Sequence, residues 1–237
     1  MVTHQQVDAV NRFLHTTYGR ERTCRLIQYF ARFYAFYLTR QGASLATIER
    51  WSELKQHVGN ARKFFRLLKP IEFAQSGIKA LNTGDEVLRI TGVLKQLGMG
   101  LYYSAEVLVL TNAIHFYQPK NIKQITDFGQ KCWLVGITAS FLSGLYKLKL
   151  LSVRHHMLVK ERTYRNIEKD DAELSKREVA LKKEHYATSY QLIQDALDFT
   201  IPSSALGWLP LDDGIVGIAG IITSLMCMNT QWVKSNP

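Results

Sequence analysis

Residues 53–71, ELKQHVGNARKFFRLLKPI, carry the strongest structural signal in this chain. At about 100° per residue, a helix over this stretch gathers an apolar stripe on one side. Basic side chains lie on a flank of the stripe, with Lys63 opposite it and Pro70 marking a kink or stop. The stripe consists of Leu54, Val58, Ala61, Phe65 and Leu68, widened by Phe64 and Ile71, and the flank consists of Lys55, Arg62, Arg66 and Lys69.

Such a helix suits the boundary between acyl chains and anionic lipid headgroups. The apolar stripe is buried among the acyl chains, and each Lys or Arg near an anionic leaflet contributes up to about 1 kcal/mol. We therefore predict that these residues bind a membrane surface. The alternative is a helix of a soluble bundle, with its apolar stripe in the core and its solvated face basic.

Composition narrows the class of partner. The 237 residues contain 30 Lys or Arg against 20 Asp or Glu, a net charge of +10, which favours an anionic partner. No RNP-like, zinc-finger or helix-turn-helix signature accompanies the charge, so we expect a membrane rather than nucleic acid. Three widely separated cysteines, Cys24, Cys132 and Cys227, favour buried reduced thiols. The N-terminus lacks the pattern of a secretory signal, so we expect any targeting signal to be internal.

The rest of the chain is predicted to be all-α, because 3.6-residue periodicity is common and strand-like alternation is rare. A first helix is expected to end near Gly19. A second, over 20–38, carries an aromatic stripe and places Arg22, Arg25 and Arg32 elsewhere on its surface.

Four parts are expected along the chain. Amphipathic, membrane-remodelling helices occupy 1–84, and hydrophobic, membrane-associated helices occupy 85–151. A charged, solvent-exposed helix or linker follows at 152–200, and a glycine-rich transmembrane helix at 201–237. Within the second part, the fifteen uncharged residues 132–146 fit either a short span or a deeply embedded helix.

The best transmembrane candidate is 214–233, which runs for twenty uncharged residues. Its glycines recur every third residue and would let another helix approach closely; they are Gly214, Gly217 and Gly220. The alternative for this stretch is a buried helix in a soluble core.

We expect no enzyme, because no nucleophile elbow, Walker loop, dinucleotide fingerprint or kinase motif set is present. His155 and His156 have no Cys or carboxylate at metal-ligand spacing, so a solvated pair is favoured over a zinc site. Asp212 and Asp213 are better explained by helix capping or hydration beside a membrane than by a catalytic dyad. No cofactor or metal is expected.

Three segments in this order resemble the peroxin-eleven family of peroxisomal membrane proteins. They are GRERTCRLIQYFARF at 19–33, NARKFFRLLK at 60–69 and DDGIVGIAGIITSL at 212–225. The resemblance implies a protein of the peroxisomal membrane that elongates and tubulates it before fission. It also implies self-association and engagement of the fission machinery, including a dynamin-related GTPase. The family's amphipathic motif maps onto Arg62, Lys63, Phe65, Arg66 and Lys69.

Two other functions remain open at this point. Some family members have been considered pore-forming, so the chain is alternatively a permeability factor for small metabolites in the same membrane. The second alternative is a soluble basic helical adaptor, which requires 214–233 to be a core helix. The number of membrane spans is left open.

Overall fold

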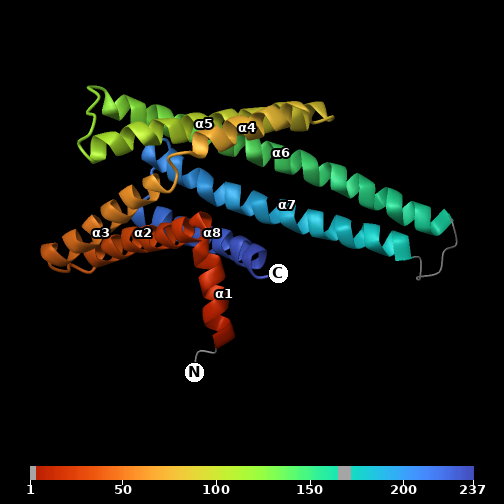
Figure 1. Ribbon diagram of the computed structural model, residues 1–237, viewed down its shortest axis with the longest axis horizontal. Coiled ribbons are helices and arrows are strands. Elements are labelled where there is room, and N and C mark those ends of the chain that lie inside the picture. Colours follow the sequence, from red (N-terminus) through yellow and green to blue (C-terminus); the bar gives the residue numbers. More distant parts are fainter. Residues whose placement is uncertain (1–3, 165–171) are drawn as a thin grey trace.

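The computed structural model describes residues 4–164 and 172–237, and over these ranges it confirms the all-α prediction. Figure 1 shows an elongated helical bundle with a short first helix projecting from one side. The helices are α1 (His4–His15), α2 (Thr17–Arg40), α3 (Leu45–Phe64), α4 (Lys69–Leu81), α5 (Glu86–Ala113), α6 (Ile122–Tyr164), α7 (Ala172–Ala205) and α8 (Asp213–Ser235).

Side-chain caps fix the start of three helices. The Thr16 hydroxyl accepts a hydrogen bond from the backbone N–H of Gly19, so Gly19 lies inside α2 and the predicted end of the first helix there is wrong. Asp85 caps α5 in the same way. Asp212 caps α8 by accepting from the N–H of Ile215, which confirms the capping role expected for this residue.

The prediction of one continuous helix over 53–71 is wrong. Helix α3 ends at Phe64, the chain turns through 65–68, and α4 begins at Lys69 with Pro70 in its first turn. Proline lacks a backbone N–H and disfavours a helical residue before it, so it starts a helix more readily than it continues one. The basic segment is therefore a helix end, a turn and a new helix start.

Two groups of helices pack around the middle of the molecule. In one, α4 and α6 both pack on α5; in the other, α3 and α8 both pack on α2. Helix α7 contacts both groups, through α6 and α8. Figure 1 shows α6 and α7 as a long antiparallel hairpin that extends beyond the rest of the bundle. Helix α6 continues through residues 151 and 152 without a break.

The three glycines of α8 lie against α2. A Cβ on Gly217 would come within 2.9 Å of the Cα of Phe33, and one on Gly214 within 2.6 Å of the Phe36 ring. A Cβ on Gly220 would overlap the ring of Tyr29. Because these three residues have no side chain, the backbone of α8 packs directly against residues of α2.

Two helices of the described residues are long and apolar enough to cross a membrane. They are Ile122–Thr163 of α6 and Asp213–Ser235 of α8, and in each an 18-residue window has a mean hydropathy of 1.3. Only 33% and 50% of their apolar windows, respectively, are buried by the rest of the protein. Helix α5 also has an exposed apolar face, made of Val87, Ile90, Leu94, Leu97, Leu101 and Leu108. Two charged residues of α5 form hydrogen bonds inside the bundle, Lys95 with Ser140 and Glu106 with Tyr102. Much of the apolar surface thus faces outward.

Candidate functional site

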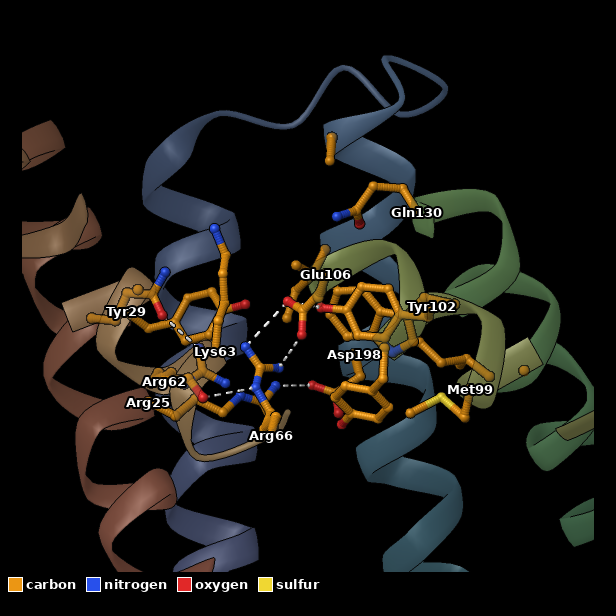
Figure 2. Close-up of a pocket in the computed structure, with 18 of the residues that line it drawn as sticks. Arg25, Tyr29, Arg62, Lys63, Arg66, Met99, Tyr102, Glu106, Gln130 and Asp198 are labelled. Atoms are coloured by element: carbon orange, nitrogen blue, oxygen red, sulfur yellow. Dashed lines mark hydrogen bonds and ion pairs between the residues drawn. The ribbon is translucent and has the colours of Figure 1, made fainter. Parts of the chain in front are cut away.

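A cavity of about 700 Å³ lies where α2, α3, α5, α6 and α7 converge, and its lining is mainly polar and charged. Figure 2 shows side chains from both helix groups pointing toward one another across it. The basic residues of the lining are Arg22, Arg25, Arg32, Lys55, Arg62, Lys63, Arg66 and Lys95, and the acidic residues are Glu106, Asp195, Asp198 and Asp213.

Arg62 joins α3 to α2. Its Nε and Nη2 donate to Oε1 of Glu21, at 3.0 and 2.7 Å, and its Nη1 donates to the side-chain oxygen of Gln28. A Cβ on Gly59 would lie 2.8 Å from the Gln28 amide nitrogen, so the missing side chain leaves room for Gln28. Burial alone would raise the pKa of Glu21, but the charges of Arg22, Arg62 and Arg66 outweigh it and lower the pKa to about 2.

Arg66 joins the turn after α3 to the middle of α5. Its Nη1 and Nη2 each lie 3.1 Å from one carboxylate oxygen of Glu106, and the Tyr102 hydroxyl donates to Oε1 of Glu106 at 2.7 Å. The Tyr102 ring stacks on Trp133 with ring centres 5.0 Å apart. Burial alone would lower the pKa of Arg66, but the charge of Glu106 outweighs it and raises the pKa.

Arg25 joins α2 to α7 and α8. Its Nη2 donates to Oδ1 of Asp198 at 2.5 Å and to the hydroxyl of Thr223 at 3.0 Å. Only 4% of Arg25 is exposed, so the part of the helix surface that carries it faces the interior of the bundle. A buried arginine requires a charged partner, and here that partner lies 173 residues away in the chain.

Two lysines of the lining lack a carboxylate partner. Lys63 donates to the side-chain oxygen of Asn60 at 3.1 Å, and Lys95 donates to the hydroxyl of Ser140 at 2.9 Å. Within the described residues, no carboxylate oxygen lies within 4.0 Å of either ammonium group. Burial lowers the pKa of Lys63, because the charged form loses hydration.

The predicted membrane-binding residues divide into two sets. The apolar side chains face outward: Leu68 is 71% exposed and Phe64 50%, while Leu54, Ala61 and Phe65 are also exposed and Val58 is half-buried. The basic side chains turn inward, because Arg62 and Arg66 are buried in ion pairs and Lys55 and Lys63 line the cavity. Lys69 pairs with Glu72 at the start of α4. Arg62 and Arg66, which were expected to face anionic headgroups, thus point into the bundle.

Sequence reasoning missed the acidic partners of the cavity. Glu21 lies in the helix predicted over 20–38 from its aromatic stripe, and Glu106 lies in the part predicted to be hydrophobic. Asp195 and Asp198 lie in the part predicted to be charged and solvent-exposed, but both are buried. A single charge inside an otherwise apolar helix is the signal that identifies such residues, because it requires a buried partner.

Comparison with known proteins agrees with the resemblance. The profile of peroxisomal biogenesis factor 11 (PEX11) matches residues 7–232. Peroxisomal biogenesis factor 11 of Schizosaccharomyces pombe is 30% identical over 233 residues, which cover 95% of this chain and 94% of the relative. The peroxisomal membrane protein PMP27 of Saccharomyces cerevisiae is 28% identical, with 98% and 97% covered. Human peroxisomal membrane protein 11B is 21% identical, with 98% and 100% covered.

No solved structure matches the chain. The relatives are peroxisomal membrane proteins, which confirms the expected location in the peroxisomal membrane and supports a role in peroxisome proliferation. The family is one of biogenesis factors rather than an enzyme family. Because its profile spans nearly the whole sequence, this protein belongs to the peroxisomal biogenesis factor 11 (PEX11) family.

Proposed function

We propose that this protein elongates the peroxisomal membrane by inserting the junction of α3 and α4 into one leaflet, and that elongation promotes fission and proliferation. The observation that carries the proposal is the cluster of exposed apolar side chains at this junction. Leu68 is 71% and Ile71 67% exposed, and Phe64, Phe65 and Leu67 surround them. Water-soluble monomers rarely leave such a cluster uncovered.

Burial of these side chains among acyl chains favours insertion by roughly 1.5–3 kcal/mol each as an upper bound. Insertion into one leaflet expands the area of that leaflet, so many copies together bias the membrane toward positive curvature. Because Arg62 and Arg66 are held in ion pairs, insertion depends mainly on the apolar face, with Lys69 at the start of α4 as the nearer candidate for headgroup contact. Anionic phospholipid then strengthens binding without being essential.

We call the inserted junction of α3 and α4 the wedge. Helices α6 and α8 would anchor it permanently, since both have apolar outer faces and are long enough to span a bilayer. A curved membrane requires many copies, so self-association is part of the proposal. Scission of the elongated membrane requires a mechanical enzyme, and the proposed partner is the fission machinery with its dynamin-related GTPase. The family resemblance supplies these two partners.

A second candidate function is a permeability pathway for small metabolites. The observation that favours it is the polar cavity of about 700 Å³ between helices whose outer faces are apolar. Ionisable residues inside an apolar bundle commonly line a solute path.

The test uses the full chain reconstituted into vesicles of phosphatidylcholine with phosphatidylserine. Wild-type protein is expected to tubulate the vesicles at high coverage, and Leu68→Glu combined with Ile71→Glu to abolish tubulation while the protein stays membrane-bound. Leu45→Glu is the matched control, because Leu45 is 78% exposed at the opposite end of α3. Unchanged tubulation by the double variant would contradict the wedge. Release of a small dye from the same vesicles separates the permeability function from the membrane-shaping function.

A further inference from the structure

The lining of the central cavity has more positive than negative charge. Eight Lys or Arg residues and four Asp or Glu residues line it, and Glu21, behind Arg62, adds one further carboxylate. Ion pairs account for Arg25 and Arg66, for Arg22 and Arg62, which share Glu21, and for Arg32 and Lys55, which share Asp213. Asp195 is a further carboxylate beside Lys95, and the net positive charge that remains lies on partly buried side chains, which favours the entry of an anion.

Lys63 and Lys95 are the groups that such an anion would contact. An ammonium group has three donors, and each of these lysines has one hydrogen bond within the described residues, to a neutral oxygen. They approach the cavity from different sides, Lys63 from the end of α3 and Lys95 from α5. Their remaining donors are therefore available to a ligand lying between the two helix groups.

The size and walls of the cavity suit an organic ion. A volume of about 700 Å³ falls within the range of about 300–1,000 Å³ usual for small-molecule sites. Beside the charged groups, the lining includes Tyr29, Met99 and the stacked pair Tyr102 and Trp133. These side chains offer apolar contact to the carbon part of a ligand, while the lysines contact its charged group.

We propose that the cavity binds a small organic anion through its phosphate or carboxylate groups, and that Lys63 and Lys95 donate hydrogen bonds to these groups. Binding can be tested separately from the leaflet wedge, because Lys63 and Lys95 line the cavity, whereas the apolar side chains of the wedge are exposed. Anion binding also does not require conduction, since a ligand can occupy a cavity that is not open to both sides of the membrane.

The first experiment measures binding to the full chain in nanodiscs made of phosphatidylcholine alone. The probes are inorganic phosphate and succinate, added at constant ionic strength against chloride, with calorimetry as the readout. Saturable binding is expected, and Lys63→Met and Lys95→Met should each weaken it about tenfold, the effect of one charge-assisted hydrogen bond. Lys63→Arg and Lys95→Arg should retain most of the affinity. Lys79→Met, at the exposed end of α4, is the control and should bind as the wild type does.

The second experiment uses wild-type protein only, so it does not depend on the folding of a variant. Reductive methylation followed by mass spectrometry measures the reactivity of each lysine with and without phosphate. Phosphate should protect Lys63 and Lys95 and leave Lys79 unprotected. Nanodiscs containing phosphatidate form a further arm: protection by phosphatidate alone would identify the bound phosphate as a lipid headgroup. Equal reactivity of Lys63 and Lys95 under every condition, or binding that survives both methionine variants, would overturn the proposal.

Discussion

Arg66 and Glu106 form a two-pronged ion pair, with both oxygen–nitrogen distances at 3.1 Å, that fixes the turn between α3 and α4 against the middle of α5. The neighbours of Arg66 in this turn, Phe65 and Leu67, are exposed. One buried charge thus sets the direction in which the apolar side chains of the turn point. The cavity and the proposed wedge are two sides of the same short segment.

Breaking this pair is expected to destabilise the protein strongly. Glu106→Gln leaves the buried Arg66 guanidinium with only Glu21, 3.9 Å away and already paired with Arg62, at a cost of up to about 3–5 kcal/mol. Replacing both partners, as Arg66→Met with Glu106→Leu, should recover most of the loss, since a buried pair is often close to neutral against apolar residues. Thermal unfolding in a nonionic detergent measures both effects. Lys69→Ala, which removes an exposed pair with Glu72, is the control and should cost less than about 1 kcal/mol. An equally small effect of Glu106→Gln would show that the pair does not hold the turn.

Acid should weaken the junction between α2 and α3. The pKa of Glu21 is lowered from 4.5 to about 2 in the folded protein, so ionised Glu21 stabilises the fold. That contribution is complete above pH 4.5, is lost as the pH falls to about 2, and amounts to roughly 3 kcal/mol at most.

Glu21→Gln tests this directly. The variant should be less stable than wild type at pH 7, and its stability should fall less between pH 4.5 and 2. The measurement is unfolding as a function of pH in a detergent without titratable groups. Glu72→Gln, an exposed carboxylate, should keep the wild-type slope. Parallel slopes for wild type and Glu21→Gln would refute the assignment.

Several features of the fold follow from local sequence signals. The all-α class follows from helical periodicity, the start of α8 from the Asp212 cap, and its apolar length from 214–233. The family was predicted from three short segments in a given order, and the family match over residues 7–232 confirms it. The glycines of α8 were expected to allow close approach of another helix, and that helix is α2.

The orientation of the basic segment could not be deduced in the same way. A helical wheel separates an apolar side from a basic side, but it does not say which side faces the rest of the protein. In a soluble bundle the apolar side is buried, whereas here Arg62 and Arg66 point inward and Leu68 outward. The inward direction is set by Glu21 and Glu106, on two other helices. Such long-range pairs have no periodic signature, so the cavity was not predicted.

Close contact between α8 and α2 should not tolerate a side chain at Gly217. Gly217→Leu places atoms against the Phe33 backbone, where even a Cβ would lie 2.9 Å from Cα. The expected cost is at least about 1–3 kcal/mol, with the protein still resistant to carbonate extraction. Gly84→Leu is the control, because no atom lies within 4 Å of a Cβ at that position. Equal unfolding temperatures for the two variants would argue against the packing described for α8.

A charged substitution on the outer face of α8 tests whether this face contacts lipid or water. Ile218 is 46% exposed near the middle of the outward stripe that also contains Ile215, Ile222 and Leu225. If lipid covers this stripe, Ile218→Arg should cost about 2.5–3.5 kcal/mol of insertion free energy and increase the fraction released by carbonate. If water covers it, the same substitution should be within about 0.5 kcal/mol of neutral, as is usual at exposed surfaces. Thr230→Arg, exposed near the end of the helix, should be tolerated in either case because a long side chain there reaches the headgroups. Carbonate extraction of the two variants from isolated peroxisomes measures the difference, and an unchanged pellet fraction for Ile218→Arg would exclude α8 as a lipid-facing span.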